Sequence, residues 1–123
     1  QKVIDFKPDV IISSVVEDTF YLWKKFMDQV TDRKFISVCG GVFCTYFPQA
    51  FEGKCDYILR GEGDEVVPEL MDLISEGKTG HHLANVHPNP MRPALDVNTL
   101  PSTDHEIFDK RSLYRPFQGE IQV

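Results

Sequence analysis

Long apolar runs and basic charge are both scarce in this sequence of 123 residues. No window approaches the ~18 consecutive apolar residues that span a membrane, and no Arg-rich or hydrophobic leader opens the chain. The 13 basic residues are outnumbered by 19 acidic ones, which gives a net charge of −6. Binding to a nucleic-acid backbone needs a basic surface. We therefore expect no membrane span and no nucleic acid as the main partner.

Cysteine is also scarce, with three residues at irregular spacing: Cys39, Cys44 and Cys55. An odd count at this spacing matches no disulfide or metal pattern. We expect buried or semi-buried thiols in a reducing, cytoplasmic environment. Three histidines, at 81, 82 and 87, fit no ligand signature either, so no metal site is predicted.

The common phosphate-binding and nucleophile motifs are missing. Gly61-Glu62-Gly63 lacks the third glycine of the dinucleotide fingerprint, and no Gly-Lys-Ser/Thr or nucleophile elbow occurs. Glu62, Asp64 and Glu65 are candidate acid–base carboxylates. The simpler interpretation is that Asp64 and Glu65 cap a helix, while Glu62 faces solvent or bonds the neighbouring turn. No catalytic residue is predicted.

Short apolar runs alternate with helical patterns in the first 80 residues. Buried strands are predicted over 10–12, 35–38 and 57–59. Apolar residues at helical spacing predict helices around 20–30 and 67–74, the second one ending at Gly77. A weaker helix candidate over 45–51 is interrupted by Pro48. The pattern predicts an α/β fold, a partial doubly wound (Rossmann- or flavodoxin-like) parallel sheet in three layers.

Proline marks the end of the chain, because five of the eight prolines lie in the final 36 residues. The predicted organisation is an α/β unit over 1–87 and an irregular Pro-rich connector over 88–123. A short strand over 83–86 and a short helix over 105–110 are also expected.

Small or polar residues follow each predicted strand: Ser13-Ser14, Gly40-Gly41 and Gly61-Glu62-Gly63. In open parallel sheets, ligands bind outside the carboxyl ends of the strands. Glycine allows a ligand to approach the backbone, and serine hydroxyls donate and accept hydrogen bonds. We therefore expect one polar rim, with the aromatic run Phe43, Tyr46 and Phe47 as a wall for a planar ligand. Each turn taken alone is better explained as a tight strand-to-helix connection than as a site.

Three segments together resemble a known family: Pro8 to Ser14 (PDVIISS), Val38 to Val42 (VCGGV) and Asp56 to Asp64 (DYILRGEGD), followed by Pro68-Glu69-Leu70. They are similar to the cobalamin-binding domain that precedes the catalytic barrel of radical S-adenosylmethionine enzymes. The tail, with Leu100-Pro101 and Tyr114-Arg115-Pro116-Phe117, resembles the connector into that barrel.

The resemblance implies cobalamin (vitamin B12) as the cofactor of the parent protein. Ser13, Ser14 and Val15 would line its nucleotide tail, Gly40, Gly41 and Val42 would pack against that tail or the corrin edge, and Gly61, Glu62 and Gly63 would border the same crevice. It further implies that two strand–helix units precede the Pro8 strand, so that this chain is the second half of the domain. The 4Fe-4S cluster and S-adenosylmethionine would belong to a downstream domain, because the Cys-x-x-x-Cys-x-x-Cys motif is not in this sequence.

The function expected from this resemblance is a contribution to a cobalamin pocket, with no catalysis and weak or no cobalamin binding by the fragment alone. The parent would transfer methyl groups or perform another radical step. Expected partners are the rest of the parent chain and a second copy, paired through the exposed edge of the 10–12 strand. One alternative is a stand-alone flavodoxin-like or nucleotide-binding module in regulation or protein interaction, its tail docking a partner. Another is a small enzyme using Glu62 and a nearby histidine.

Overall fold

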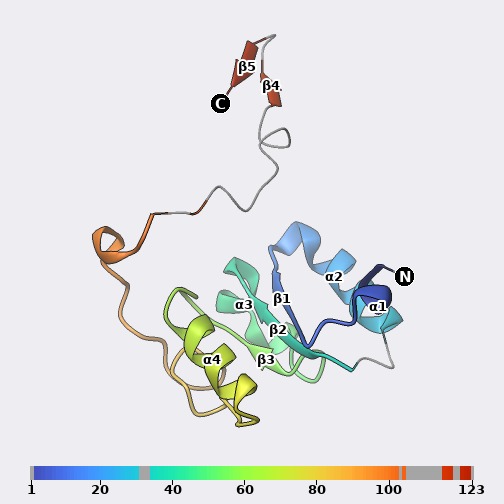
Figure 1. Cartoon of the computed structure of the whole chain (residues 1–123), viewed down its shortest axis with the longest axis vertical. Helices are drawn as coiled ribbons and strands as arrows, with labels where there is room; N and C mark the ends of the chain where they lie inside the picture. The colour runs from blue at the N-terminus through green and yellow to red at the C-terminus, as the bar shows by residue number, and fades with distance from the viewer. Residues whose placement is uncertain (1, 31–33, 103, 105–114, 118–119, 123) are drawn as a thin grey trace.

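The computed structural model describes residues 2–30, 34–102, 104, 115–117 and 120–122. Helix α1 (Lys2–Phe6) leads into strand β1 (Val10–Ser14), and helix α2 (Glu17–Gln29) follows. After it come β2 (Ile36–Gly40), α3 (Val42–Tyr46), the 3-10 turn η1 (Pro48–Ala50), β3 (Tyr57–Ile58) and α4 (Val66–Ser75). This alternation, seen in Figure 1, confirms the α/β fold that the sequence predicts.

The three strands form one parallel sheet in the order β1-β2-β3. The register pairs Val10 with Ile36 and Ser14 with Gly40 between the first two strands. Strand β3 pairs with the second half of β2, with Val38 opposite Tyr57. Because the strands are parallel, their carboxyl ends come out at one edge of the sheet.

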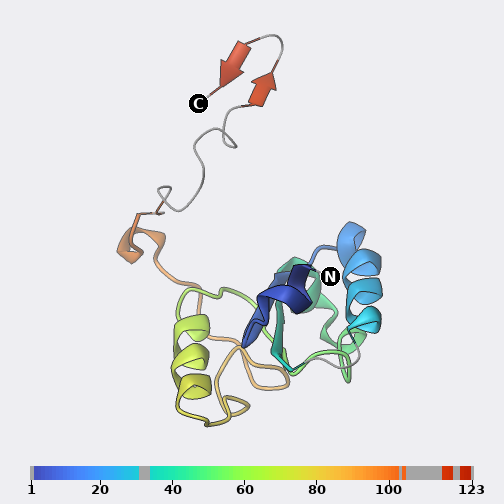
Figure 2. The same ribbon diagram turned by 45° about the vertical axis from the view of Figure 1, so that its right-hand side comes forward.

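Helices cover both faces of the sheet. Figure 2 shows α2 and α4 on opposite sides of it. One core cluster lies on the α2 side and contains Trp23, Met27, Cys39, Cys44 and Phe51, among others. The second cluster lies on the α4 side; its buried members are Val38, Tyr57, Leu59, Val66, Leu70 and Val86. Neighbouring β2 residues 38 and 39 thus enter opposite cores, as strand geometry requires.

The two main helices that the sequence predicts are present, and their ends differ from the predicted ones by a few residues. Helix α2 carries Glu17 and Asp18 in its first turn, where the helix dipole favours acidic groups. Helix α4 has Pro68 in its first turn and ends just before Gly77, which has a φ of 70°. The weak candidate over 45–51 is two pieces, because Pro48 separates α3 from η1.

The segment after α4 departs from the expected strand over 83–86. Instead of a strand, Val86 forms a single antiparallel bridge with Leu59. The reason is the turn at Asn85, whose φ of 71° breaks an extended conformation. Further on lie the 3-10 turn η2 (Val97–Thr99) and a two-stranded antiparallel sheet of β4 (Arg115–Phe117) and β5 (Glu120–Gln122). The helix expected over 105–110 lies outside the described residues.

None of the helices in the described part of the chain has the length and apolar character to cross a membrane.

The rim at the carboxyl edge of the sheet

The turns after β1 and β2 are in direct contact. The backbone N–H of Val15 donates to the Gly40 carbonyl at 2.8 Å, and the Phe43 N–H donates to the Val15 carbonyl at 3.2 Å. A Cβ at Gly41 would lie 2.8 Å from Val15 N and 2.9 Å from Ser14 Oγ. Only glycine fits, because Gly41 also has a φ of 98°.

One threonine joins the turns after β2 and β3. The Thr45 hydroxyl donates to the Gly41 carbonyl at 3.0 Å and accepts from the Gly61 N–H at 2.9 Å. The three strand ends therefore form one continuous edge, as expected from the polar residues that follow the strands. Thr45 was not among the residues predicted from the sequence, although a threonine four residues after a glycine turn is a signal for such a bond.

The predicted site residues differ in exposure along this edge. Ser14, Val42, Gly61 and Glu62 are exposed, whereas Ser13, Gly40, Gly41 and Gly63 are half-buried. The side chain of Val15 is in the core, so only its backbone belongs to the edge. The structure brings all three turns together at the level of the backbone, while their contact with a cofactor stays a prediction.

The three aromatic residues near the edge differ in exposure, although the rings of Phe43 and Phe47 are in contact, with 5.3 Å between centroids. Phe43 packs into the core with its ring centroid 5.1 Å from that of Phe20 and 5.7 Å from that of Phe51. Tyr46 and Phe47 are exposed, at 73% and 58%. A wall for a planar ligand on this side would therefore consist of Tyr46 and Phe47, since Phe43 is used for packing.

Two acidic residues after β3, Glu62 and Glu65, bind the tail of the chain. Glu65 stands at the N-cap position with no side-chain capping bond, and its carboxylate accepts from Arg92 at 3.2 Å. Glu62 accepts from the Leu95 N–H at 2.7 Å. The capping expected of Glu65 is therefore wrong, because an arginine from the tail takes its carboxylate. The bond of Glu62 is to the tail and not to the neighbouring turn.

The histidines point to separate partners. The ring of His81 stacks on Tyr57, with 4.4 Å between centroids, and His87 Nε2 lies 3.0 Å from Glu52 Oε1. Glu62 bonds the backbone of Leu95 instead, so the structure does not pair it with a histidine. In the part of the chain that the structure describes, no group of three or more His, Cys, Asp or Glu residues is arranged to hold a metal ion.

Cys39 and Cys44 are buried in the core cluster on the α2 side, and Cys55 is partly buried against it. Hydrogen bonds with Cys44 and Cys55, together with burial, raise the pKa of the Cys39 thiol. A raised pKa keeps Cys39 protonated and unreactive. This environment matches the buried thiols expected from the sequence.

The fold and the rim together define a partial Rossmann- or flavodoxin-like α/β protein. No family model matches the chain, and no solved structure matches it. The chain is similar to an uncharacterized methyltransferase of Pyrococcus horikoshii, at 28% identity over 85% of this chain and 26% of the relative. The chain thus spans about a quarter of the length of that curated relative, and it is distantly related to a protein described as a methyltransferase.

Proposed function

We propose that this chain forms the second half of a cobalamin-binding domain in a radical S-adenosylmethionine enzyme, with methyl transfer as the reaction of the whole protein. The observation that carries the proposal is the continuous edge made by the turns after β1, β2 and β3, tied together through Gly41 and Thr45. Ligands of open parallel sheets bind at this edge. The similarity to a much longer methyltransferase supports the reaction class.

In this proposal the cofactor would lie close to the backbone of the glycine turns at this edge and would accept hydrogen bonds from uncharged groups. Ser14, which is exposed, and Ser13, which is half-buried, would line the nucleotide tail and could donate hydrogen bonds to it through their hydroxyls. The close contact of Gly41 with Ser14 and Val15 leaves the backbone of this turn without side-chain cover. Cobalamin supplies methyl transfer through its cobalt, and no side chain described here is assigned as a cobalt ligand.

The unpaired edge of the sheet indicates which parts of a longer polypeptide would pack against this chain. In the described residues β1 pairs only with β2, which leaves its other edge open for a further strand. We propose that strand–helix units of the longer polypeptide cover this edge in the whole protein. The 4Fe-4S cluster and S-adenosylmethionine are proposed for a downstream domain, outside this chain.

The proposal is tested with the longer protein that contains this chain, titrated with hydroxocobalamin and followed by absorbance. We expect stoichiometric binding, which Gly41→Val weakens at least about tenfold, because the added side chain collides with Val15 and Ser14. Gly53→Val is the matched control, since a Cβ at Gly53 meets nothing within 4 Å although its φ is also positive.

A second arm of the same experiment uses flavin mononucleotide. Tight flavin binding without cobalamin binding would overturn the proposal in favour of a flavodoxin-like module. The 123-residue chain alone is expected to bind hydroxocobalamin weakly or not at all. Tight stoichiometric binding by it would contradict the idea that half of the pocket lies outside this chain.

A further inference from the structure

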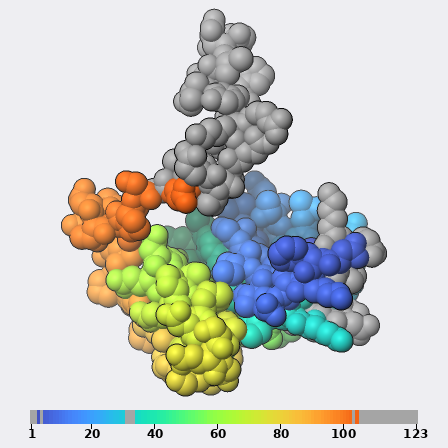
Figure 3. Space-filling view, in the orientation of Figure 1, coloured from blue at the N-terminus to red at the C-terminus, as the bar shows by residue number. Residues whose placement is uncertain are grey.

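Residues 85–95, here called the strap, run back along β3 and over the start of α4. Figure 3 shows the part of the chain after α4 packed directly against this helix. The strap has no regular secondary structure, yet it contacts the α/β unit along its length. Val86 is buried in the second core cluster, and the His87 N–H donates to the Ile58 carbonyl at 2.9 Å. Three further sets of contacts involve Asn85, Arg92 and Leu95.

Asn85 joins the strap to the turn after β3. It is 3% exposed, and its side-chain amide donates to the carbonyls of Arg60 at 2.7 Å and Glu62 at 3.4 Å. Its side-chain oxygen accepts from the Arg92 N–H at 2.9 Å, and its backbone N–H donates to the Pro90 carbonyl at 3.0 Å. A buried polar side chain satisfied in this way fixes both segments, because an unpaired group there would be costly.

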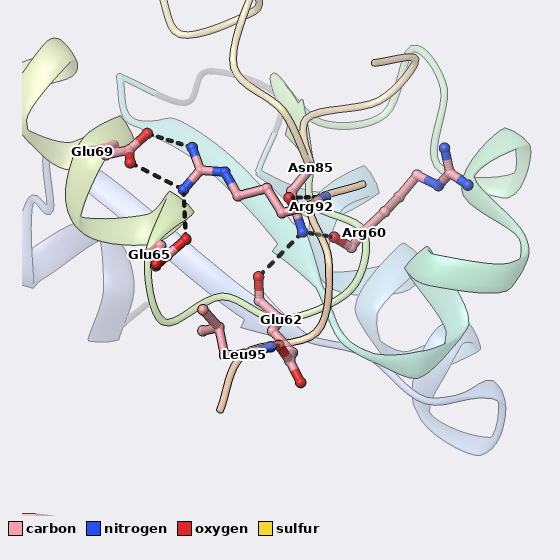
Figure 4. A network of polar contacts seen from close by, with 7 residues as sticks. All are labelled: Arg60, Glu62, Glu65, Glu69, Asn85, Arg92 and Leu95. Atoms are coloured by element: carbon pink, nitrogen blue, oxygen red, sulfur yellow. Dashed lines mark hydrogen bonds and ion pairs between the residues drawn. The ribbon is translucent and has the colours of Figure 1, made fainter. Parts of the chain in front are cut away.

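Arg92 then clamps the strap to α4. Its guanidinium donates to both carboxylate oxygens of Glu69, at 3.0 and 2.6 Å, and to Glu65 at 3.2 Å. Figure 4 shows the two carboxylates converging on Arg92, while the guanidinium of Arg60 points away from this network. A bidentate arginine–carboxylate pair is geometrically specific, unlike an ordinary surface ion pair.

The third contact lies at the far end of the strap. The carboxylate of Glu62, exposed on the rim, accepts from the Leu95 N–H at 2.7 Å. Between the strap and the turn after β3 there is an open pocket of ≈ 190 Å³. This is smaller than the roughly 300–1,000 Å³ of typical small-molecule sites.

We propose that three residues, Asn85, Arg92 and Glu62, together form a latch, which means that they hold the strap and the Gly61–Gly63 turn in one fixed arrangement. The latch also places the chain that follows Leu95 at the carboxyl edge of the sheet. Arg92 acts on α4 and Glu62 on Leu95, while Asn85 lies between them and bonds both the strap and the turn. Whatever follows Leu95 therefore begins next to the rim. All three are positioning residues, and the proposal does not depend on the identity of any ligand.

The test is hydrogen exchange of the whole chain, read by mass spectrometry at the amides of Asn85, Arg92 and Leu95. In Arg92→Gln and in Glu62→Ala we expect exchange of these amides to accelerate about tenfold, with no change in β2. Arg92→Lys keeps the charge but loses the paired geometry, so it should give an intermediate value. Lys24→Gln, which breaks the exposed Lys24–Asp28 pair on α2, is the matched control and should change none of these amides.

The decisive result is the effect of each variant on the distant end of the strap. Faster exchange of the Arg92 amide in Glu62→Ala supports a latch, because Glu62 does not bond Arg92 through its side chain. If Glu62→Ala accelerates exchange only at the Leu95 amide, the proposed latch is contradicted. Equal acceleration throughout β2 and α4 in Arg92→Gln would also overturn it, since the arginine would then hold the fold as a whole.

Discussion

At the scale of single residues, Gly41 does the most to bring the strand ends together. Its φ of 98° and ψ of −179° lie in a region that is essentially restricted to glycine. The space for a Cβ is filled by backbone atoms of Val15, which cannot move aside as a flexible side chain would. The contact between the turns after β1 and β2 therefore depends on the absence of a side chain.

We expect Gly41→Ala to lower the free energy of unfolding by about 2–4 kcal/mol, from backbone strain and the collision with Val15 together. Gly53→Ala measures the backbone strain alone, because Gly53 also has a positive φ and nothing lies within 4 Å of its Cβ position. For this variant we expect the free energy of unfolding to fall by about 1 kcal/mol. Urea unfolding of both variants measures the difference. Equal losses at the two positions would show that the close contact at Gly41 contributes nothing.

At the scale of elements, α4 is held from two directions. Val66 and Leu70 are buried in the core beneath it, and Glu65 and Glu69 on its exposed side bond Arg92 of the strap. The hydrogen bonds from Arg92 hold the pKa of the Glu69 carboxyl below its ordinary value of 4.5. A lowered pKa means that the contact has its full strength above pH 4.5 and is lost as the pH falls through the lowered value.

Titration of the Glu69 carboxyl carbon by NMR checks this directly. We expect a midpoint below 4.5 in the native chain and a return towards the ordinary value in Arg92→Gln, because the charged donor has been removed. High salt should reduce the difference only in part, since hydrogen bonding outweighs the longer-range attraction as its cause. A midpoint that does not respond to Arg92→Gln would show that the ion pair is not formed in solution.

At the scale of the whole molecule, the sheet is asymmetric. Ile12 of β1 is in register with Val38 of β2, so both side chains lie on the face of the sheet that α4 covers. Val38 is 1% exposed, whereas Ile12 is 50% exposed. Within β1, Val10 is half-buried against the core cluster on the α4 side, whereas Ile12 is left largely uncovered. Strand β1 pairs with β2 alone in the described residues. An apolar strand with an open edge favours pairing with another chain.

We expect the isolated 123-residue chain to form a dimer through β1 at concentrations well above micromolar, as measured by light scattering. Ile12→Lys should shift it to a monomer, because a charge on an open edge opposes pairing. Leu22→Lys is the matched control, since Leu22 is 54% exposed on α2, away from this edge. A monomeric native chain, or a dimer unaffected by Ile12→Lys, would contradict this role of the β1 edge.

The sequence by itself determined the three parallel strands, the helices α2 and α4 between and after them, and their order. Strong local signals define these elements: apolar runs for β1 to β3, helical spacing in α2 and α4, and glycine or proline near the ends of α3 and α4. Parallel pairing also follows from the sequence, since strands separated by helices must cross over the sheet. For the same reason, the order of strands and helices along the chain is enough to place the three polar turns at one edge.

Only the tertiary structure decided which residues in and near the polar turns are exposed, and which residues form hydrogen bonds with them. The sequence pattern favoured Glu65 as a cap of α4 and a strand over residues 83–86. Arg92, 27 positions away from Glu65, takes its carboxylate instead, and the turn at Asn85 prevents the strand. Likewise, Thr45 joins two turns, and Phe43 enters the core because α2 provides Phe20 as its partner. The physical reason is that periodicity reports local conformation and burial, whereas partners distant in sequence are chosen by packing.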